Sequence, residues 1–243
     1  MFIEKIKAFR NFLLDLIFPK ECLSCGKEGL YLCSECLKKI ELNKKFYCTF
    51  CKKESDLSKV CPSCQGQTVL KAVWLASDYN NELLQRLIHN LKYNYIEELA
   101  EILSRLIINY LEENKIFQNL NFKNEEIIFA PVPLHKKRLL QRGFNQSYLL
   151  AEKLSNYYKI PIINLLSRSK NTESQVNLKR SDRQENIRNA FIFNNEFESL
   201  KNKKIILVDD VVTTGSTLRE CADILSNNGF FEIYGLVIAQ RED

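Results

Sequence analysis

Residues 205–218 constrain the fold of this chain more than any other segment. Residues 205–208 are apolar and predict a buried strand that ends in two carboxylates. A hydroxyl-rich loop at residues 213–217 follows, and then an apolar-periodic helix begins. Because loop N–H groups converge there beside the positive end of a helix, this order predicts an anion site at the edge of a sheet. The carboxylates are Asp209 and Asp210, and the expected anion-binding residues are Val211, Val212, Thr213, Thr214, Gly215, Ser216 and Thr217.

The two carboxylates need a separate explanation, because carboxylates repel phosphate. Ionised aspartate only accepts hydrogen bonds, whereas the two hydroxyls of a sugar diol donate them. A phosphate one loop away from a diol describes a ribose 5-phosphate. The alternative is an ordinary strand–turn–helix junction in which threonine and serine serve as N-caps. A Walker loop is excluded, since the segment contains no Gly-Lys-Ser/Thr triplet.

Eight of the nine cysteines form four Cys-x2-Cys pairs. Each pair can place two thiolates on one side of a metal, and two pairs complete the tetrahedral sulfur site that suits zinc. We therefore expect about two structural Zn²⁺ ions per chain. A module this small cannot build a core alone, so the metal supplies its folding energy. The expected ligands are Cys22, Cys25, Cys33, Cys36, Cys48, Cys51, Cys61 and Cys64.

The spacing leaves two alternatives open for these cysteines. Pairing in sequence, the first knuckle with the second and the third with the fourth, needs only short loops, and interleaved pairing is the alternative. Disulfides or redox-active pairs are disfavoured by an expected cytoplasmic location and by the fourfold repetition. The ninth cysteine, Cys221, lies among apolar residues of the helix after residue 217, and we expect it to be a buried small hydrophobe.

Strand and helix patterns alternate after the cysteines. Strands that alternate with helices favour an α/β fold whose mainly parallel sheet carries helices on both faces. The 213–217 loop then lies at the carboxyl end of a strand, where ligands bind in such sheets. Residues 167–189 are polar and predict a mobile loop. The expected strands are residues 69–76, 127–130, 162–166, 190–193, 205–208 and 233–239, and the expected helices are 82–93, 96–111 and 147–157.

Charge is unevenly distributed along the chain. The net charge is +5, but residues 134–188 carry twelve Lys/Arg against four Asp/Glu. That excess favours a polyanionic ligand, although a solvated helix face accounts for part of it. Residues 1–18 have the spacing of an amphipathic helix, which packs on the protein or rests on a membrane surface. They lack the uninterrupted apolar core of a signal peptide, and no membrane span is predicted, so we expect a cytoplasmic protein.

Residues 208–217 resemble the phosphoribosyl pyrophosphate (PRPP) loop of type I phosphoribosyltransferases. Over essentially its whole length the chain resembles the ComF family, zinc-ribbon proteins with a phosphoribosyltransferase-like domain. Some of them are required for DNA uptake in natural competence, and one relative is linked to gluconate utilisation. Besides that loop, the motifs in family order are Leu-Ile-Phe-Pro at 16–19, Leu-Lys-Tyr at 91–93, Pro-Val-Pro-Leu-His at 131–135 and Arg-Gly-Phe-Asn-Gln at 142–146.

The resemblance implies a type I phosphoribosyltransferase-like fold and a binding site for PRPP with Mg²⁺. Three parts are expected: an amphipathic helix at 1–19, a double zinc ribbon at 20–67 and a phosphoribosyltransferase-like domain at 68–243. The acid pair would hold the ribose diol and serve as the catalytic residues. The residues expected to hold pyrophosphate are Pro131, Val132, Pro133, Arg138 and Arg142.

Three groups of residues near this site carry further expectations. Arginine forks suit pyrophosphate, although a single arginine can equally be a surface charge. The polar stretch 175–188, which includes Arg180, Arg183 and Asn186, is expected to close over the ligand as a lid. His135 either touches pyrophosphate or caps a turn.

Two functions follow, and they do not exclude each other. The first is an enzyme that transfers a phosphoribosyl group from PRPP to an unidentified nucleobase or amine. The second, which the resemblance favours, is a competence protein that binds single-stranded DNA, with PRPP as a ligand. A competence helicase and a DNA-processing protein are the partners that this second function implies.

Overall fold

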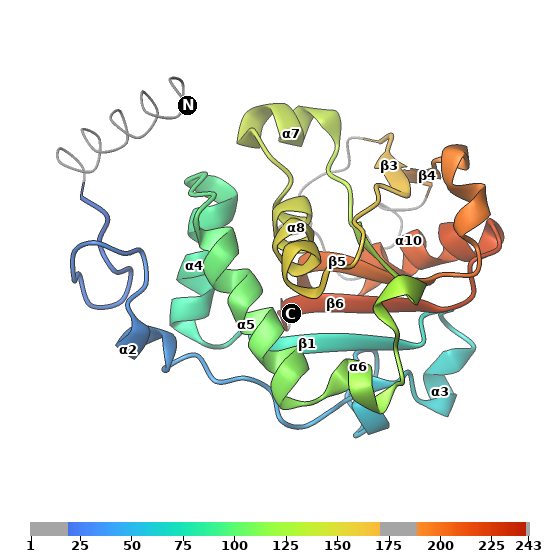
Figure 1. Cartoon of the computed structure of the whole chain (residues 1–243), viewed down its shortest axis with the longest axis horizontal. Helices are drawn as coiled ribbons and strands as arrows, with labels where there is room; N and C mark the ends of the chain where they lie inside the picture. The colour runs from blue at the N-terminus through green and yellow to red at the C-terminus, as the bar shows by residue number, and fades with distance from the viewer. Residues whose placement is uncertain (1–18, 171–188, 242–243) are drawn as a thin grey trace.

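Four parallel strands form the central sheet of the computed structural model, which describes residues 19–170 and 189–241 (Figure 1). The strand order is β1-β6-β5-β2, and every neighbouring pair is parallel. The inner strands are apolar and buried along most of their length, as strands covered on both faces require. The predicted mainly parallel sheet is confirmed. The strands are β1 (Ala72–Asp78), β2 (Ile127–Pro131), β5 (Lys204–Val212) and β6 (Ile233–Gln240).

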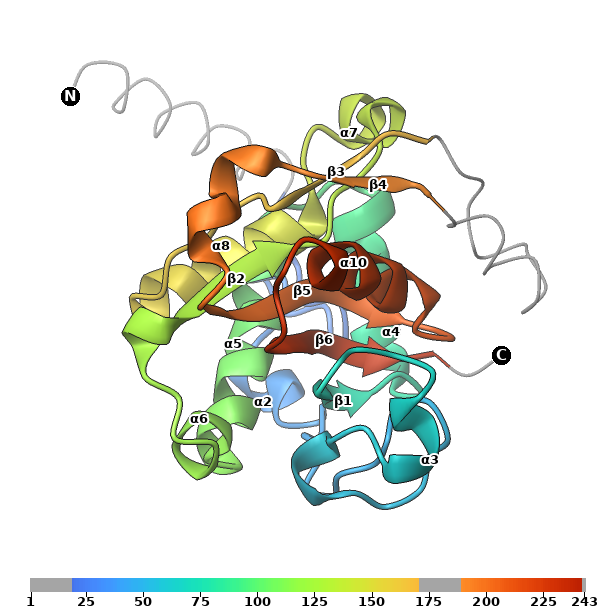
Figure 2. The same ribbon diagram turned by 90° about the vertical axis from the view of Figure 1, so that its right-hand side faces the viewer.

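Helices cover both faces of this sheet (Figure 2). Successive side chains of a strand point to opposite faces, so Ile206 and Val208 pack under one layer and Ile205 and Leu207 under the other. The first layer consists of α4, α5 and α8, and α10 lies in the second. The long helices are α4 (Glu82–Tyr93), α5 (Leu99–Glu113), α8 (Gln146–Tyr158) and α10 (Ser216–Asn227).

Two short strands form a separate antiparallel sheet, β3 (Leu166–Arg168) with β4 (Phe191–Phe193). The strand predicted at 162–166 was therefore wrong in extent, because β3 includes only its last residue. Ile162 forms a bridge to the central sheet at Phe129, and β3 begins at Leu166, which pairs with Phe193 of β4. The remaining short helices are α2 (Ser34–Leu37), η1 (Asp56–Ser58), α3 (Pro62–Gln65), α6 (Ile116–Asn119), η2 (Asn124–Glu126), α7 (Lys136–Arg142) and η4 (Asn195–Leu200).

Backbone pairing also moves the ends of two predicted strands. β5 does not end before the acid pair but continues to Val212, because Val211 and Val212 still pair with β6. β1 starts and ends later than predicted, since the polar residues Ser77 and Asp78 pair with β6 as well. The helix predicted at 82–93 has the bounds of α4.

The cysteine-rich segment lies along the outer edge of β1. Leu42 bridges Ser77 and Lys59 bridges Ala72, both in antiparallel fashion. The backbone N–H of Asn43 donates to the Ala76 carbonyl at 3.0 Å. These contacts cover backbone groups that an edge strand would otherwise present to other chains.

Two sequence-based predictions fall outside the described residues. They are the N-terminal amphipathic helix within residues 1–18 and the lid at 175–188. Among the residues that the structure describes, no helix has both the length and the apolar character needed to cross a membrane.

Candidate anion-binding and metal sites

The 213–217 loop joins the carboxyl end of β5 to the start of α10. Gly215 has φ +76°, a left-handed conformation that disfavours other side chains, and it occupies the N-cap position of α10. Gly215 has no side chain that could cap the helix, so the alternative of a serine or threonine at the N-cap position is wrong, although the Ser216 N–H donates to Thr214 Oγ1 at 3.4 Å. Thr214 Oγ1 in turn donates to Ser216 Oγ at 3.1 Å. The loop thus presents a helix N-terminus, with glycine at its N-cap, beside hydroxyl groups, an arrangement suited to an anion.

Two side chains fix the backbone of the loop from outside. Gln240, at the end of β6, donates through Nε2 to the Thr213 carbonyl at 2.9 Å. Arg219, one turn into α10, donates through Nη2 to the Thr214 carbonyl at 2.8 Å. With these carbonyls engaged elsewhere, the loop can turn its N–H groups and hydroxyls toward a ligand.

The acid pair sits directly before the loop and is held from two helices. Asp209 Oδ1 accepts from Ser147 Oγ of α8 at 2.8 Å. Asp210 is 2% exposed, and its Oδ2 forms an ion pair with Lys92 Nζ of α4 at 2.5 Å. The two neighbouring carboxylates therefore have different partners: a hydroxyl for one and a buried ammonium for the other.

This environment shifts the pKa values of the acid and of the lysine. Burial raises the pKa of Asp209 to about 7, repulsion from Asp210 adds to the shift, and the Ser147 bond and Lys92 oppose it. Burial opposes the charge of Lys92, but the attraction of Asp210 outweighs it and the pKa of the ammonium is raised. Asp209 is thus poised to change its charge near neutral pH.

The Pro-Val-Pro segment follows β2 and lies beside β5. The Val132 N–H donates to the Val208 carbonyl at 2.9 Å, and Asn145 Nδ2 donates to the Val132 carbonyl at 3.0 Å. Pro131 is the last residue of β2, and the partly exposed Pro133 leads toward α7. His135 Nδ1 accepts from the Lys137 N–H at 3.2 Å, so His135 caps α7, one of the two roles that we expected for it.

The two predicted arginines lie on α7, close to Tyr93 at the end of α4. The Arg142 guanidinium lies 5.8 Å from the centroid of the Tyr93 ring, next in the chain to Lys92, and also donates to Gln146 Oε1 at 2.5 Å. Burial lowers the pKa of Arg138, and the positive charge of Arg142 lowers it further. Two guanidiniums close enough to repel each other favour an anionic ligand between or beside them.

Sequence analysis missed a third arginine. Arg168, the last residue of β3, has its guanidinium 5.2 Å from the centroid of the Phe191 ring. Burial lowers the pKa of Arg168, and repulsion from Arg138 adds to this, while Asp209 attracts the charge. The structure thus brings Arg168 to the same side of the site as the α7 arginines.

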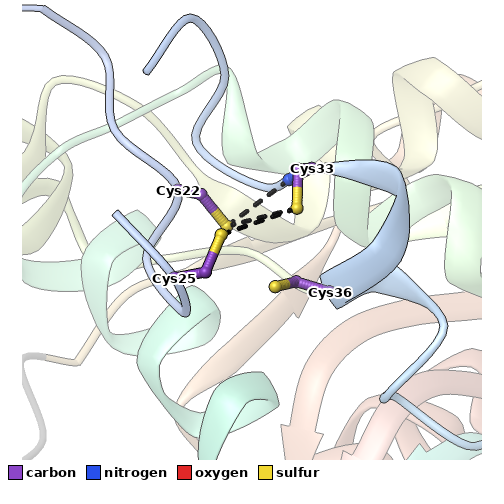
Figure 3. A group of neighbouring side chains, drawn as sticks. All are labelled: Cys22, Cys25, Cys33 and Cys36. Carbon is purple, nitrogen blue, oxygen red and sulfur yellow. Dashed lines mark hydrogen bonds between the residues drawn. The ribbon is translucent and has the colours of Figure 1, made fainter. Parts of the chain in front are cut away.

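The eight paired cysteines form two groups, which we call the first cluster (22, 25, 33, 36) and the second cluster (48, 51, 61, 64). In each cluster the sulfur atoms all lie within 4.8 Å of one another. Figure 3 shows the four thiols of the first cluster directed toward a common point. Pairing in sequence is therefore confirmed, and the interleaved alternative is wrong.

The chemistry of both clusters fits structural zinc. Burial opposes ionisation of Cys22, but backbone N–H groups of Cys33, Cys25 and Ser24 outweigh it and lower its pKa to about 6. In the second cluster, N–H groups of residues 61, 51 and 50 likewise overcome burial and lower the pKa of Cys48 to about 7, while burial and the neighbouring thiols raise the pKa of Cys64 to about 12. Four thiolates with no other ligand would close the coordination sphere, as in structural sites. Cys221 stands apart: it is fully buried on α10, as predicted, and burial raises the pKa of its thiol.

Known proteins match both parts of the chain. A family model described as Phosphoribosyl transferase domain matches residues 140–242, and one described as Double zinc ribbon domain matches residues 13–68. Competence protein F of Haemophilus influenzae is 35% identical over 228 residues, which are 89% of this chain and 95% of that protein. The chain belongs to the ComF family.

Two further relatives extend the comparison. Competence protein ComFC of Bacillus subtilis is 30% identical over 207 residues, 82% of this chain and 79% of that protein. DNA utilization protein YhgH of Escherichia coli strain K12 is 30% identical over 215 residues, 82% of this chain and 92% of that protein. The matches span the zinc ribbon and the phosphoribosyltransferase fold, so this ComF-family chain combines both.

Lys92 and Ser147 are the acid-pair partners that sequence reasoning missed. Lys92 lies within the 91–93 motif that carried the family resemblance, but the motif assigned it no role. The pattern of α4 offered no signal, since a lysine in the last turn of an amphipathic helix is favoured by the helix dipole without any buried partner. Ser147 lies in the first turn of α8, which Asn145 caps with its side chain. The sequence can indicate such a capped helix start, but it does not indicate the contact between Ser147 and Asp209.

Proposed function

We propose that this ComF-family protein binds PRPP with Mg²⁺ and handles single-stranded DNA during natural competence. The observation that carries the first part is the acid pair at the end of β5, one loop before the N-terminus of α10. The 213–217 loop would hold the 5-phosphate, and Asp209 and Asp210 would accept from the ribose hydroxyls. Arg138, Arg142 and Arg168 would face the pyrophosphate, and Mg²⁺ would neutralise part of its charge.

Calorimetry with PRPP and Mg²⁺ tests this binding. The variant Asp209→Asn removes a charge-assisted acceptor and is expected to weaken binding by about 1.5–3 kcal/mol. Asp210→Asn is less suitable, because it leaves Lys92 without its carboxylate partner. Asp223→Asn, an exposed carboxylate on α10, is the matched control and should bind like the wild type. Absence of PRPP binding in the zinc-loaded wild type would reject the proposal.

The DNA part is supported by the names of the relatives and by the surface beside the site. Competence protein F, ComFC and the DNA utilization protein YhgH are relatives over most of the chain. Tyr93 and Tyr95 are 48% and 50% exposed, and the exposed Lys136 and Lys137 of α7 accompany them. Exposed aromatic rings beside positive charge suit stacking of bases and contact with phosphates. A DNA-translocating helicase and a DNA-processing protein are the expected partners.

Fluorescence anisotropy with a labelled oligothymidylate tests the DNA part. Log affinity should fall with log salt at about −0.7 per phosphate contact. Tyr93→Ala should weaken binding, while Tyr157→Ala, an equally simple loss of an exposed ring on α8, should not. If α7 serves both ligands, PRPP with Mg²⁺ should reduce DNA binding. No binding even at low salt would leave a metabolic enzyme as the better proposal.

A phosphoribosyltransferase that acts on a nucleobase or an amine is the second candidate. It is favoured by the position of two adjacent carboxylates, since negative charge under the sugar would stabilise the positive charge that develops at the ribose as pyrophosphate leaves. The bond from ribose C1 to pyrophosphate would break as the bond to the acceptor forms. Pyrophosphate release from PRPP with a panel of nucleobases and amines tests this candidate, with Asp209→Asn as the inactive control.

A further inference from the structure

The first knuckle of the second cluster, residues 48–51, packs directly against the 213–217 loop. Gly215 marks the contact: a Cβ built there would lie 2.7 Å from Phe50 Cε1, too close for any real side chain. The Phe50 ring thus occupies the space beside the turn of the loop. A residue between two zinc ligands touches the one loop position that needs a left-handed backbone.

Arg219 connects the same ring to the loop a second time. Its guanidinium lies 4.8 Å from the centroid of the Phe50 ring, within the range of a cation–π contact. The same guanidinium donates to the Thr214 carbonyl at 2.8 Å. Phe50 therefore supports an arginine that fixes the loop backbone, in addition to its own contact with Gly215.

Gln240 forms a third connection between knuckle and loop. Its Nε2 donates to the Thr49 carbonyl at 3.2 Å and to the Thr213 carbonyl at 2.9 Å. Lys52, the residue after Cys51, donates to Gln240 Oε1. Thr49 is in turn fixed to the sheet, since its Oγ1 donates to the Val73 carbonyl at 3.3 Å. One amide side chain thus ties the carbonyl of the knuckle to the carbonyl of the loop.

The first cluster contacts a different part of the molecule. Its knuckle residue Leu23 accepts from Arg86 Nη1 of α4 at 3.2 Å, and Leu23 packs with the helices of the opposite face. Figure 1 shows α2, which carries Cys36, and α3, which carries Cys64, well apart in the molecule, and Figure 2 agrees. The first cluster therefore contacts the helices of one face of the sheet, whereas the second cluster contacts the 213–217 loop.

We propose that the second cluster is part of the phosphate site: Thr49 and Phe50, held in place when zinc occupies that cluster, position the 213–217 loop for its anion. This inference rests on the proposed binding of PRPP. It makes Phe50 a positioning residue, which acts through the loop backbone and Arg219 and does not touch the ligand. A Phe50 that only filled space would alter the free energy of unfolding and leave the affinity of the folded protein unchanged.

Binding of PRPP with Mg²⁺ to the zinc-loaded full chain tests this, with zinc content measured on the same samples. Phe50→Ala keeps all eight ligands and should retain about two zinc ions per chain while PRPP affinity falls about tenfold or more. Leu23→Ala is the matched control, a side-chain loss in the first knuckle, and it should bind PRPP like the wild type. Phe50→Leu, which keeps an apolar side chain, serves if Phe50→Ala does not fold, and it should bind more weakly than the wild type.

The outcomes separate this inference from the proposal on which it rests. If the wild type does not bind PRPP, the proposed function fails. If the wild type binds and both Phe50 variants bind equally well with their zinc intact, the positioning role is overturned. An equal loss of affinity in Leu23→Ala would also overturn it, because the effect would then be general to the zinc module.

Discussion

The two clusters have the same kind of ligand set, four cysteines each, but they contact different parts of the molecule. The first cluster packs with α4 and the helices of one face of the sheet, and the second packs beside the 213–217 loop on the other. Between the cysteines of the leading knuckle, the first cluster has Leu-Ser and the second has Thr-Phe. The difference teaches that the residues enclosed by a knuckle decide what it contacts: Phe50 lies against Gly215, whereas Leu23 packs with the helices of the opposite face.

The largest expected effect comes from removing one ligand at matched positions. Cys61→Ser and Cys33→Ser should each reduce zinc from about two ions to about one per chain. Only Cys61→Ser should abolish PRPP binding, because only the second cluster contacts the loop. Metal analysis measures the zinc content and calorimetry measures PRPP binding. Loss of PRPP binding in Cys33→Ser but not in Cys61→Ser would show that the first cluster, not the second, supports the site.

Lys92 lies on α4, one of the helices in the layer of the first cluster, and the importance of its ion pair with Asp210 can be tested directly. Lys92→Met leaves Asp210 buried without its ammonium and should destabilise the fold by about 3–5 kcal/mol. The control Lys59→Met breaks an exposed ion pair with Asp56 and should cost about 0–1 kcal/mol. Urea unfolding gives both values. Equal effects would mean that the Lys92 pair is no more important than a surface pair.

A double-mutant cycle sharpens the contact between Phe50 and the loop. Gly215→Ala introduces a Cβ at φ +76° and against the Phe50 ring, so a loss of about 1–3 kcal/mol in stability is expected. In the double variant with Phe50→Ala the clash disappears and the backbone strain stays. The loss of stability in the double variant should therefore be smaller than the sum of the losses in the two single variants. Strict additivity would show that ring and loop are independent.

The last expected effect concerns pH and belongs to neither cluster. Burial raises the pKa of Asp209 from 3.8 in the unfolded chain to about 7, so the folded protein keeps a proton that the unfolded chain has released. Its contribution to stability therefore falls as pH rises from about 4 to about 7 and then levels off. Across the same upper range PRPP affinity should rise, as the carboxylate forms. Asp209→Asn should flatten both profiles, while Phe50→Ala should keep their shape.

Local patterns in the sequence predicted the parts of the site that lie within one segment. The strand, acid pair and loop before α10 follow from apolar and hydroxyl runs at 205–218, and the cysteine pairing follows from spacing. Lys92, Ser147, Arg168 and Phe50 were missed, because each acts across the fold on a residue distant in sequence. For the same reason β3 was misplaced: its extent depends on β4, which no local pattern of residues 162–166 contains.

The covering of β1 by the cysteine-rich segment has a consequence for the chain without metal. Asn43 and Lys59 lie along this edge only while the segment around them keeps its shape. Once zinc is removed, a seven-residue strand of low charge, Ala72–Asp78, would present its backbone to other molecules. Removal of zinc by a chelator should therefore lead to self-association by strand addition, which light scattering would detect. Bound zinc would then protect the protein from aggregation in the cell.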